Sequence, residues 1–165
     1  MPQTISKLHT ALLEWMHYDP DTGIFTWLKH RGKGVAGMRA GGLWSNGYRW
    51  LQFYGISASE SHWAVFYMTG AWPVDQVDHR DRNPTNNSWN NLRESTHSQN
   101  QHNRGPHRDN KCGVKGVSWR PEKNRWRATI AVDGRKIELG LHRDFETACR
   151  VRAAASARYH GEFAI

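Results

Sequence analysis

The chain has 165 residues, and its 23 Lys and Arg against 15 Asp and Glu give a formal net charge of +8. This excess predicts an anionic partner, either an anionic polymer or an anionic membrane surface. Apolar residues make up 38% and nine residues are Trp, which excludes a disordered basic tail. No apolar run of about 18 residues and no basic segment leading into an apolar one occurs, so we expect no transmembrane helix, no signal peptide and a cytoplasmic location.

Two cysteines, Cys112 and Cys149, are too few and too far apart for a Cys-rich zinc site. A disulfide between them is possible, but free thiols are favoured in a reducing compartment. Any metal ion must therefore be held by Asp, Asn, His or Glu side chains.

The first half of the chain predicts a β-rich scaffold that includes two helices. Apolar residues at near-helical spacing indicate the helices, and aromatic or branched runs indicate the strands. The glycine-dense stretch 32–47 is typical of a loop between strands. The expected elements are a helix over 5–16, a turn at 19–23, strands at 24–28 and 48–54, and a helix over 61–68.

Residues 75–104 are unusually polar and contain seven Asn. Within them Val77, Asp78 and His79 place a carboxylate and an imidazole directly after an apolar residue. Hydrolysis of a phosphodiester needs a cation to neutralise the phosphate and the leaving oxygen, and a base near neutral pKa to activate water. Asp78 and His79 supply one candidate for each. Because successive side chains of a strand point to opposite faces, a second element must complete a metal site.

Thr96 and Gln99 fit a capping box, which predicts a short helix with Asn100 in its first turns. The amide oxygen of Asn100 and the carboxylate of Asp78 would form a hard, all-oxygen ligand set that favours Mg²⁺ or Mn²⁺ over Zn²⁺. Asn91 could hold the intervening loop or orient the imidazole, and both roles stay open. The remaining loop asparagines are expected to form turns; they are Asn83, Asn86, Asn87 and Asn90.

After Arg104, residues 105–112 form a predicted linker that contains both Gly and Pro. Beyond it we expect strands at 117–119, 126–132 and 136–139, with a hairpin turn at Asp133 and Gly134, and a helix over 147–159. Residues 105–165 carry 13 basic and 7 acidic side chains, which is about +6 of the total charge. The basic side chains of the final helix are expected to form a solvated face; they are Arg150, Arg152 and Arg158.

The polar region resembles the HNH nuclease family, especially its free-standing and homing-type members common in phages. The resemblance rests on Val77-Asp78-His79, Asn86-Asn87, Asn91-Leu92-Arg93 and residues 98–104, and weaker likeness extends back to about residue 10. It implies a ββα-metal motif over about 75–104. In this motif His79 would be the general base, Asp78 and Asn100 would hold one divalent cation, Mg²⁺ or Mn²⁺, and Asn91 would complete the catalytic set in a structural role.

Three further positions of this region have open roles. Asn103 could lie behind the metal ligands or brace the helix. His102 could contact phosphate or back up the metal, although a solvated helix face is the favoured interpretation. At Trp63 the family usually has an arginine; if that arginine contacts DNA or braces the site, its replacement lowers the expected efficiency.

The C-terminal residues resemble the AP2 domain shared by plant transcription factors and phage nucleases. The resemblance rests on Gly113 to Trp119, Arg125 to Ile130, Leu139-Gly140 and the closing Tyr159 to Ala164. It implies a three-stranded sheet in the DNA major groove, supported from behind by a helix.

Strand alternation places Arg125, Arg127 and Thr129 on one face of that sheet, and Trp126, Ala128 and Ile130 toward the helix. Ser118 and Glu138 stand where the plant proteins carry arginine or tryptophan, so recognition should differ and be looser. For Trp119 two roles stay open, stacking on a DNA base and packing in the core. The expected DNA contacts are Arg120, Arg125, Arg127, Lys136 and Trp119.

Together these patterns predict an α+β chain with a nuclease domain at 1–104, a linker at 105–112 and a DNA-binding domain at 113–165. The main hypothesis is a metal-dependent endonuclease that acts on double-stranded DNA, as a monomer or weak dimer and with no protein partner implied. The alternative is a DNA-binding regulator whose catalytic site has lapsed. A nuclease for structured RNA is a distant third.

Overall fold

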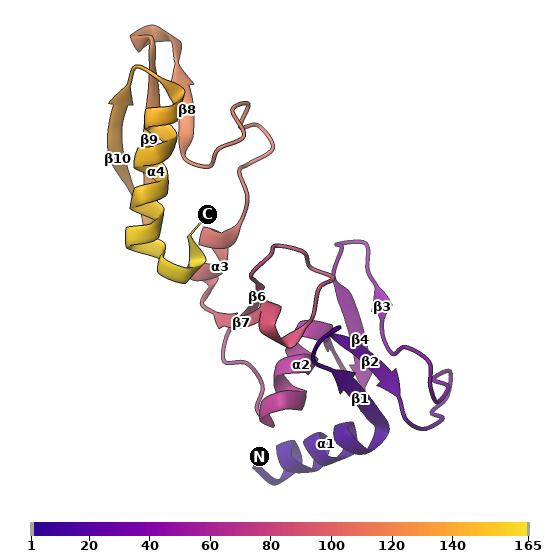
Figure 1. The fold of residues 1–165 in the computed structure, drawn as a ribbon. Helices are drawn as coiled ribbons and strands as arrows, with labels where there is room; N and C mark the ends of the chain where they lie inside the picture. Colours follow the sequence, from indigo (N-terminus) through magenta and orange to yellow (C-terminus); the bar gives the residue numbers. More distant parts are fainter. Residues whose placement is uncertain (1, 165) are drawn as a thin grey trace. The chain divides into compact units, whose positions relative to one another are not determined.

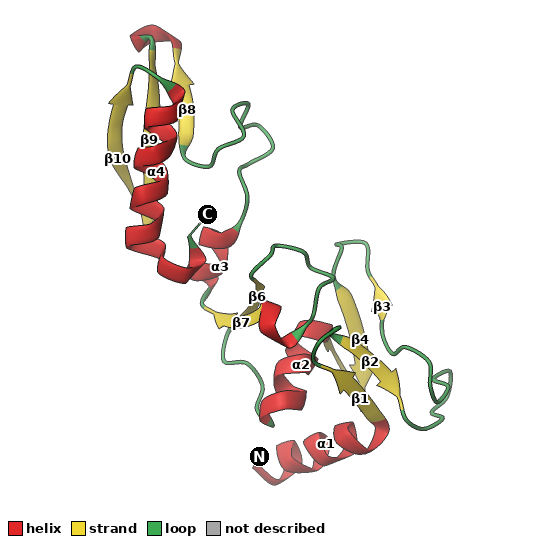
Figure 2. Ribbon diagram, in the orientation of Figure 1, coloured by secondary structure: helices red, strands yellow, loops and turns green. Residues whose placement is uncertain are grey.

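The computed structural model describes residues 2–164, with side chains from residue 4 onward. The chain divides into two compact units between Ser95 and Thr96. Small antiparallel sheets and four α-helices make up the fold, so the expected α+β class is confirmed (Figures 1 and 2). Within residues 2–164 no helix has the length and apolar character needed to cross a membrane.

The N-terminal unit contains three antiparallel sheets, β1-β2, β3-β4-β5 and β6-β7. The predicted helices and strands of this unit are present within a few residues of their expected bounds, whereas β1, β3 and β5 were not expected. Its helices are α1 (Pro2–Trp15) and α2 (Glu60–Thr69), with the 3₁₀ turn η1 (Trp89–Asn91). Its strands are β1 (Met16–Asp19), β2 (Ile24–Trp27), β3 (Gly42–Leu43), β4 (Arg49–Phe53), β5 (Ile56–Ser59), β6 (Gln76–His79) and β7 (Leu92–Ser95).

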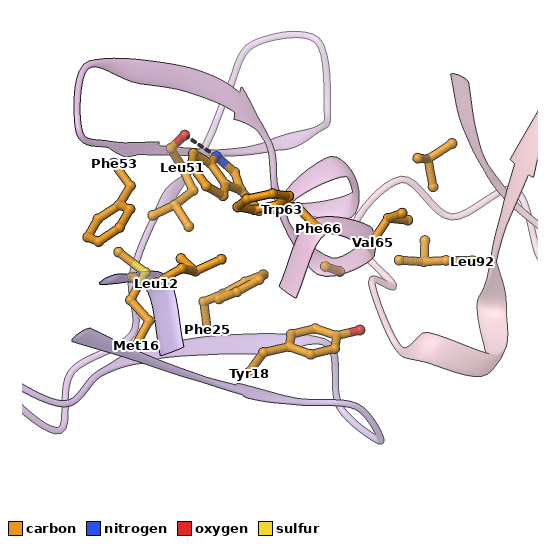
Figure 3. Close-up of a cluster of buried hydrophobic side chains, with 13 residues drawn as sticks. Leu12, Met16, Tyr18, Phe25, Leu51, Phe53, Trp63, Val65, Phe66 and Leu92 are labelled. Atoms are coloured by element: carbon orange, nitrogen blue, oxygen red, sulfur yellow. Dashed lines mark hydrogen bonds between the residues drawn. The ribbon is translucent and has the colours of Figure 1, made fainter. Parts of the chain in front are cut away.

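An aromatic core holds this unit together (Figure 3). Phe66 stacks on Trp72 with ring centroids 4.7 Å apart, and the fully buried Trp63 meets both rings edge-on. The indole nitrogen of Trp63 donates to the carbonyl of Leu51 at 2.9 Å, so its single polar group is satisfied in the core. Position 63 therefore serves packing in this chain.

The turn between β1 and β2 packs closely on the loop that follows β6. Asp19 accepts hydrogen bonds from the Thr22 hydroxyl at 2.7 Å and from the Asp21 amide at 3.0 Å. Gly23 has φ of 70°, and a Cβ placed there would lie 2.1 Å from the carbonyl carbon of Asn87. Only glycine permits both this backbone conformation and this approach.

The C-terminal unit contains a three-stranded antiparallel sheet of order β10-β9-β8 (Figure 1). Trp126 packs on Phe145 of the helix α4 at 4.7 Å, and Ala128 is fully buried with Ala148. The helices are α3 (His97–Asn103) and α4 (Phe145–His160), with the 3₁₀ turns η2 (Pro121–Lys123) and η3 (Gly161–Phe163). The strands are β8 (Val117–Arg120), β9 (Arg125–Val132) and β10 (Arg135–His142). The last is longer than expected, because its pairing with β9 continues past a bulge between Glu138 and Gly140.

Helix α3 belongs to the C-terminal unit, whereas the sequence placed the domain boundary after it, at 105–112. The ring of His102 stacks on His160 with centroids 3.6 Å apart. The ammonium of Lys115 donates to three carbonyl oxygens at the end of α3, those of Gln101, His102 and Arg104, at 2.7, 2.9 and 2.7 Å. These contacts attach α3 to the residues that follow it.

Arg152 was expected on a solvated face, and this was wrong: it is only 3% exposed. The prediction failed because the side of α4 that carries Arg152 and His160 faces the loop at Gly116 and the end of β9. Arg150 and Arg158 are exposed, as expected. Cys112 and Cys149 are free thiols, also as expected.

We expect Gly23→Ala to destabilise the chain more than Gly55→Ala. Both glycines have positive φ, at 70° and 79°, but a Cβ at Gly55 meets no atom within 4 Å. Backbone strain alone should cost Gly55→Ala about 1 kcal/mol. Gly23→Ala adds the clash with Asn87, so its free energy of unfolding in urea should fall by at least twice as much. Equal losses in the two variants would contradict the close packing of this turn.

Candidate functional site

The hairpin of β6 and β7 places a carboxylate opposite a guanidinium. Asp78 is the cross-strand partner of Arg93, so both side chains lie on the same face. Arg93 donates to Oδ2 of Asp78 from Nε at 2.8 Å and from Nη2 at 2.7 Å. Both residues are buried, and charge pairing in such surroundings fixes the carboxylate in one position.

His79, the last residue of β6, is also buried but takes its partner from the following loop. Its Nε2 lies 2.9 Å from the amide oxygen Oδ1 of Asn87. An amide oxygen only accepts hydrogen bonds, so Nε2 carries the hydrogen and Nδ1 is the basic nitrogen of the neutral ring. The contact therefore selects one tautomer of His79.

Asn87 is itself held at both ends. Its side-chain nitrogen faces Oε2 of Glu60 at 3.4 Å, and its backbone carbonyl accepts from the Tyr18 hydroxyl at 2.7 Å. Burial, followed by the charge of Asp19, raises the pKa of Tyr18, which keeps this donor protonated. Asn87 is 1% exposed, so the expectation of a simple turn residue was wrong. The sequence offered one signal, because Asn86-Asn87 is part of the family resemblance.

Glu60 anchors this chain of contacts from the first turn of α2. It accepts from Nε of Arg49 at 2.9 and 3.0 Å, and Arg39 lies 3.4 Å away. Burial raises the pKa of Glu60, and the two arginines offset part of that rise. Nearby His62 has a lowered pKa, because burial and then the charge of His79 disfavour its protonated form. Sequence reasoning missed Glu60, since no spacing connects it with the polar loop.

Asn91 closes the loop between β6 and β7. Its Oδ1 accepts from the Asp81 amide at 3.0 Å, and its Nδ2 donates to the Asp81 carboxylate at 2.9 Å and to the Asn86 carbonyl at 2.7 Å. Partial burial raises the pKa of Asp81, but hydrogen bonds from Asn86, Asn83 and Asn91 outweigh it, so the pKa is lowered overall. Asn91 was expected either to hold the loop or to orient the imidazole, and these contacts hold the loop.

The capping box that begins α3 is confirmed: the Thr96 hydroxyl accepts from the Gln99 amide, and the Gln99 side chain accepts from the Thr96 amide. Asn100 lies in the first turns of this helix, and its backbone N–H donates to the Thr96 carbonyl at 3.0 Å. Asp78 and His79 thus lie on β6, and Asn91 lies at the end of the loop that leads to β7. The other three predicted site residues lie in the C-terminal unit; they are Asn100, His102 and Asn103.

The oxygen-rich residues of this region suit a hard divalent cation better than a zinc ion. Within the part of the chain that the structure describes, no three His, Cys, Asp or Glu side chains are grouped so as to hold a metal ion. The predicted donors are one carboxylate, Asp78, and one amide oxygen, Asn100. Each of these two side chains offers an oxygen, the type of ligand that a hard divalent cation prefers.

The sheet of the C-terminal unit carries a basic face away from α4. Arg120 pairs with Arg125 across β8 and β9, and Ser118 pairs with Arg127, so these side chains share one face. Arg127 is bound to Glu138 through two hydrogen bonds of 3.0 and 2.9 Å, and these bonds lower the pKa of Glu138. Thr129 lies on the same face but is buried, and its hydroxyl donates to the Gly116 carbonyl at 3.2 Å.

Trp119 stands apart from the arginines. It is the cross-strand partner of Trp126, and the two rings meet edge-on at 5.2 Å. Since Trp126 packs on Phe145 of α4, Trp119 lies at the margin of the helix-covered face, where it is 40% exposed.

Comparison with known proteins finds matches to the β6-β7 hairpin and the helices around it. The family described as HNH endonuclease matches residues 61–102, which span most of α2, the β6-β7 hairpin and most of α3, so the chain contains an HNH-type domain. It belongs to the same family as Protein 3.8 of Escherichia phage T7, with which it is 32% identical over 88 residues, or 53% of this chain and 72% of that protein. No solved structure matches the chain.

We expect Asn87→Ala to release the tautomer of His79. Without the amide oxygen, the hydrogen on Nε2 loses its acceptor, so the neutral ring should populate both tautomers. The ¹⁵N chemical shifts of the imidazole report this directly. Asn83→Ala, in the same loop but exposed, is the matched control and should leave the His79 shifts unchanged. Identical ring shifts in wild type and Asn87→Ala would contradict the assignment.

Proposed function

We propose that this chain is a metal-dependent endonuclease that hydrolyses phosphodiester bonds of double-stranded DNA. The observation that carries the proposal is the pair of neighbouring buried groups in the HNH-type domain: Asp78, fixed by Arg93, and His79, fixed as one tautomer by Asn87. The basic sheet of the C-terminal unit supports DNA as the substrate.

In this mechanism His79 is the general base. With Nε2 bound to Asn87, Nδ1 accepts a proton from the water that attacks phosphorus. Transfer of that proton leaves an imidazolium, whose Nε2–H still donates to the Asn87 oxygen. Glu60 and Tyr18 keep Asn87 in place during this change. Asn91 contributes by fixing the loop on which Asn87 lies.

Asp78 and Asn100 are the proposed ligands of one divalent cation, Mg²⁺ or Mn²⁺. The cation would neutralise charge on the scissile phosphate and the leaving oxygen. Arg93 holds Oδ2 of Asp78, which orients the carboxylate. Because Asn100 lies on α3, we propose that the functional nuclease domain extends to residue 104, with 105–112 as linker. His102 and Asn103 would then support the site from α3.

We propose that residues 113–165 form an AP2-like DNA-binding domain, which holds the enzyme on its substrate. Arg120, Arg125 and Lys136 are the proposed contacts, with Arg127 held by Glu138 and Trp119 at the sheet margin. One site has one base and one cation position, so a monomer would nick, and two copies would be needed for a double-strand break. A phage-encoded, homing-type role in the host cytoplasm is the proposed setting. The T7 relative supports the phage origin alone.

The alternative of a DNA-binding regulator with a lapsed site was motivated by Trp63. Trp63 is fully buried among aromatic rings, and its indole is bonded to Leu51. Its presence therefore says nothing against a working base or cation site, and the nuclease is favoured.

Cleavage of supercoiled plasmid with Mg²⁺ or Mn²⁺ tests the activity. Wild type should convert supercoiled to nicked circles, and chelation should stop it. His79→Ala should lower the rate of cleavage about 10²–10⁴-fold, the usual contribution of a general base. Asn100→Ala should lose cleavage activity, because it removes a proposed ligand of the cation. His17→Ala, an exposed histidine on β1, is the control and should cleave normally. Tight DNA binding without cleavage by wild type would instead favour the regulator.

The sheet face can be tested separately from cleavage, in buffer without divalent cations. Arg125→Ala should weaken DNA binding and reduce the slope of log K against log salt by about 0.9, the change expected when one phosphate is no longer neutralised. Glu138→Gln should strengthen binding, because it removes a negative charge from the same face and releases Arg127. Fluorescence anisotropy over a range of salt measures both, and unchanged binding in both variants would remove this face from the interface.

A further inference from the structure

One face of α4 carries three buried polar side chains at successive turns. Arg152, Ser156 and His160 are 3%, 1% and 8% exposed. Among the described residues, Nε and Nη1 of Arg152, the Ser156 hydroxyl and Nδ1 of His160 have no hydrogen-bond partner. Buried polar groups are nearly always satisfied, and a buried guanidinium without an acceptor is costly. These unpaired atoms therefore indicate that a ligand supplies the missing hydrogen-bond partners.

Arg152 and His160 line a cavity within the C-terminal unit. Four more basic or imidazole side chains line it, together with one carboxylate, Asp133; they are His97, His102, Lys115 and Lys136. Lys115 is tied to carbonyl oxygens of α3, so it contributes charge to the cavity. The resulting excess of positive charge selects an anion.

The backbone of Gly116 packs directly against Arg152. A Cβ at this position would lie 2.7 Å from Nε of Arg152 and 2.3 Å from the carbonyl oxygen of Thr129. The backbone there has φ of 77°, which also favours glycine. The loop thus approaches Arg152 closely without covering it with a side chain.

We propose that this cavity binds a phosphoryl group. The guanidinium of Arg152 can donate to the oxygens of a phosphate, which are acceptors of the kind that Nε and Nη1 lack. Nε2 of His160 lies 2.9 Å from the Ala131 carbonyl and so carries the hydrogen. Its Nδ1 accepts a hydrogen from the ligand or from a water bound beside it. The phosphoryl group comes either from a DNA strand or from free phosphate or a phosphomonoester.

The test is the melting temperature of the full chain in phosphate and in chloride at equal ionic strength. At ten times its Kd, phosphate should raise the Tm of wild type by about 3 °C or more. Arg152→Met should lose this difference, whereas Arg150→Met, exposed on the same helix, should retain it. No phosphate-specific shift in wild type, or an equal shift in Arg152→Met, would overturn the proposal.

The same variant separates ligand binding from a structural role. In phosphate-free chloride, Arg152→Met should melt no lower than wild type, because it removes a buried charge that has no acceptor. If Arg152→Met does not fold, Arg152→Lys retains a charge and loses the fork; it should bind phosphate at least tenfold more weakly by calorimetry. Binding of equal strength in Arg152→Lys would overturn the role of the guanidinium.

DNA binding identifies the source of the phosphoryl group. If a DNA strand supplies it, Arg152→Met should reduce the slope of log K against log salt by about 0.9. If the slope is unchanged while wild type binds inorganic phosphate, the ligand is a free phosphate compound; both outcomes support the site. No divalent cation is present in these measurements, so failure of the proposed cleavage activity would leave this result unaffected.

Discussion

The structure of the N-terminal unit depends on the requirement that each buried polar group has a hydrogen-bond partner. The amide of Asn87 is almost completely buried between a carboxylate and an imidazole, and its two ends have opposite hydrogen-bonding character. Since its nitrogen faces Glu60, its oxygen must face His79. Asn87 therefore links Glu60 of helix α2 to His79, the candidate base at the end of β6, and orients its ring.

The scaffold around this contact can be understood from the same constraint. Gly23 allows the β1-β2 turn to reach the backbone of Asn87, and Tyr18 supplies a hydroxyl to its carbonyl. The aromatic core under α2 fixes the helix that carries Glu60. Asn91 closes the loop from the other side. Elements far apart in the chain thus converge on one short polar segment.

In the C-terminal unit the constraint is met only in part. On the sheet Arg127 is paired with Glu138, whereas α4 buries Arg152 with no acceptor for Nε and Nη1. A folded chain tolerates such a cost where another molecule supplies the missing partner. The two units thus use polar burial in different ways: the first to fix a side chain, the second to leave a place for a ligand.

The sequence by itself determined the elements and the residue types of the site. Hydrophobic periodicity located the main helices and strands, the capping box located α3, and the spacing of Asp78, His79, Asn91 and Asn100 indicated the HNH-type region, because these signals are local. Only the tertiary structure decided that Asn87 and Glu60 hold His79, that Trp63 lies in the core, and that Arg152 is buried. Their partners lie many residues away, and burial depends on which face of an element another element covers, which no local pattern records.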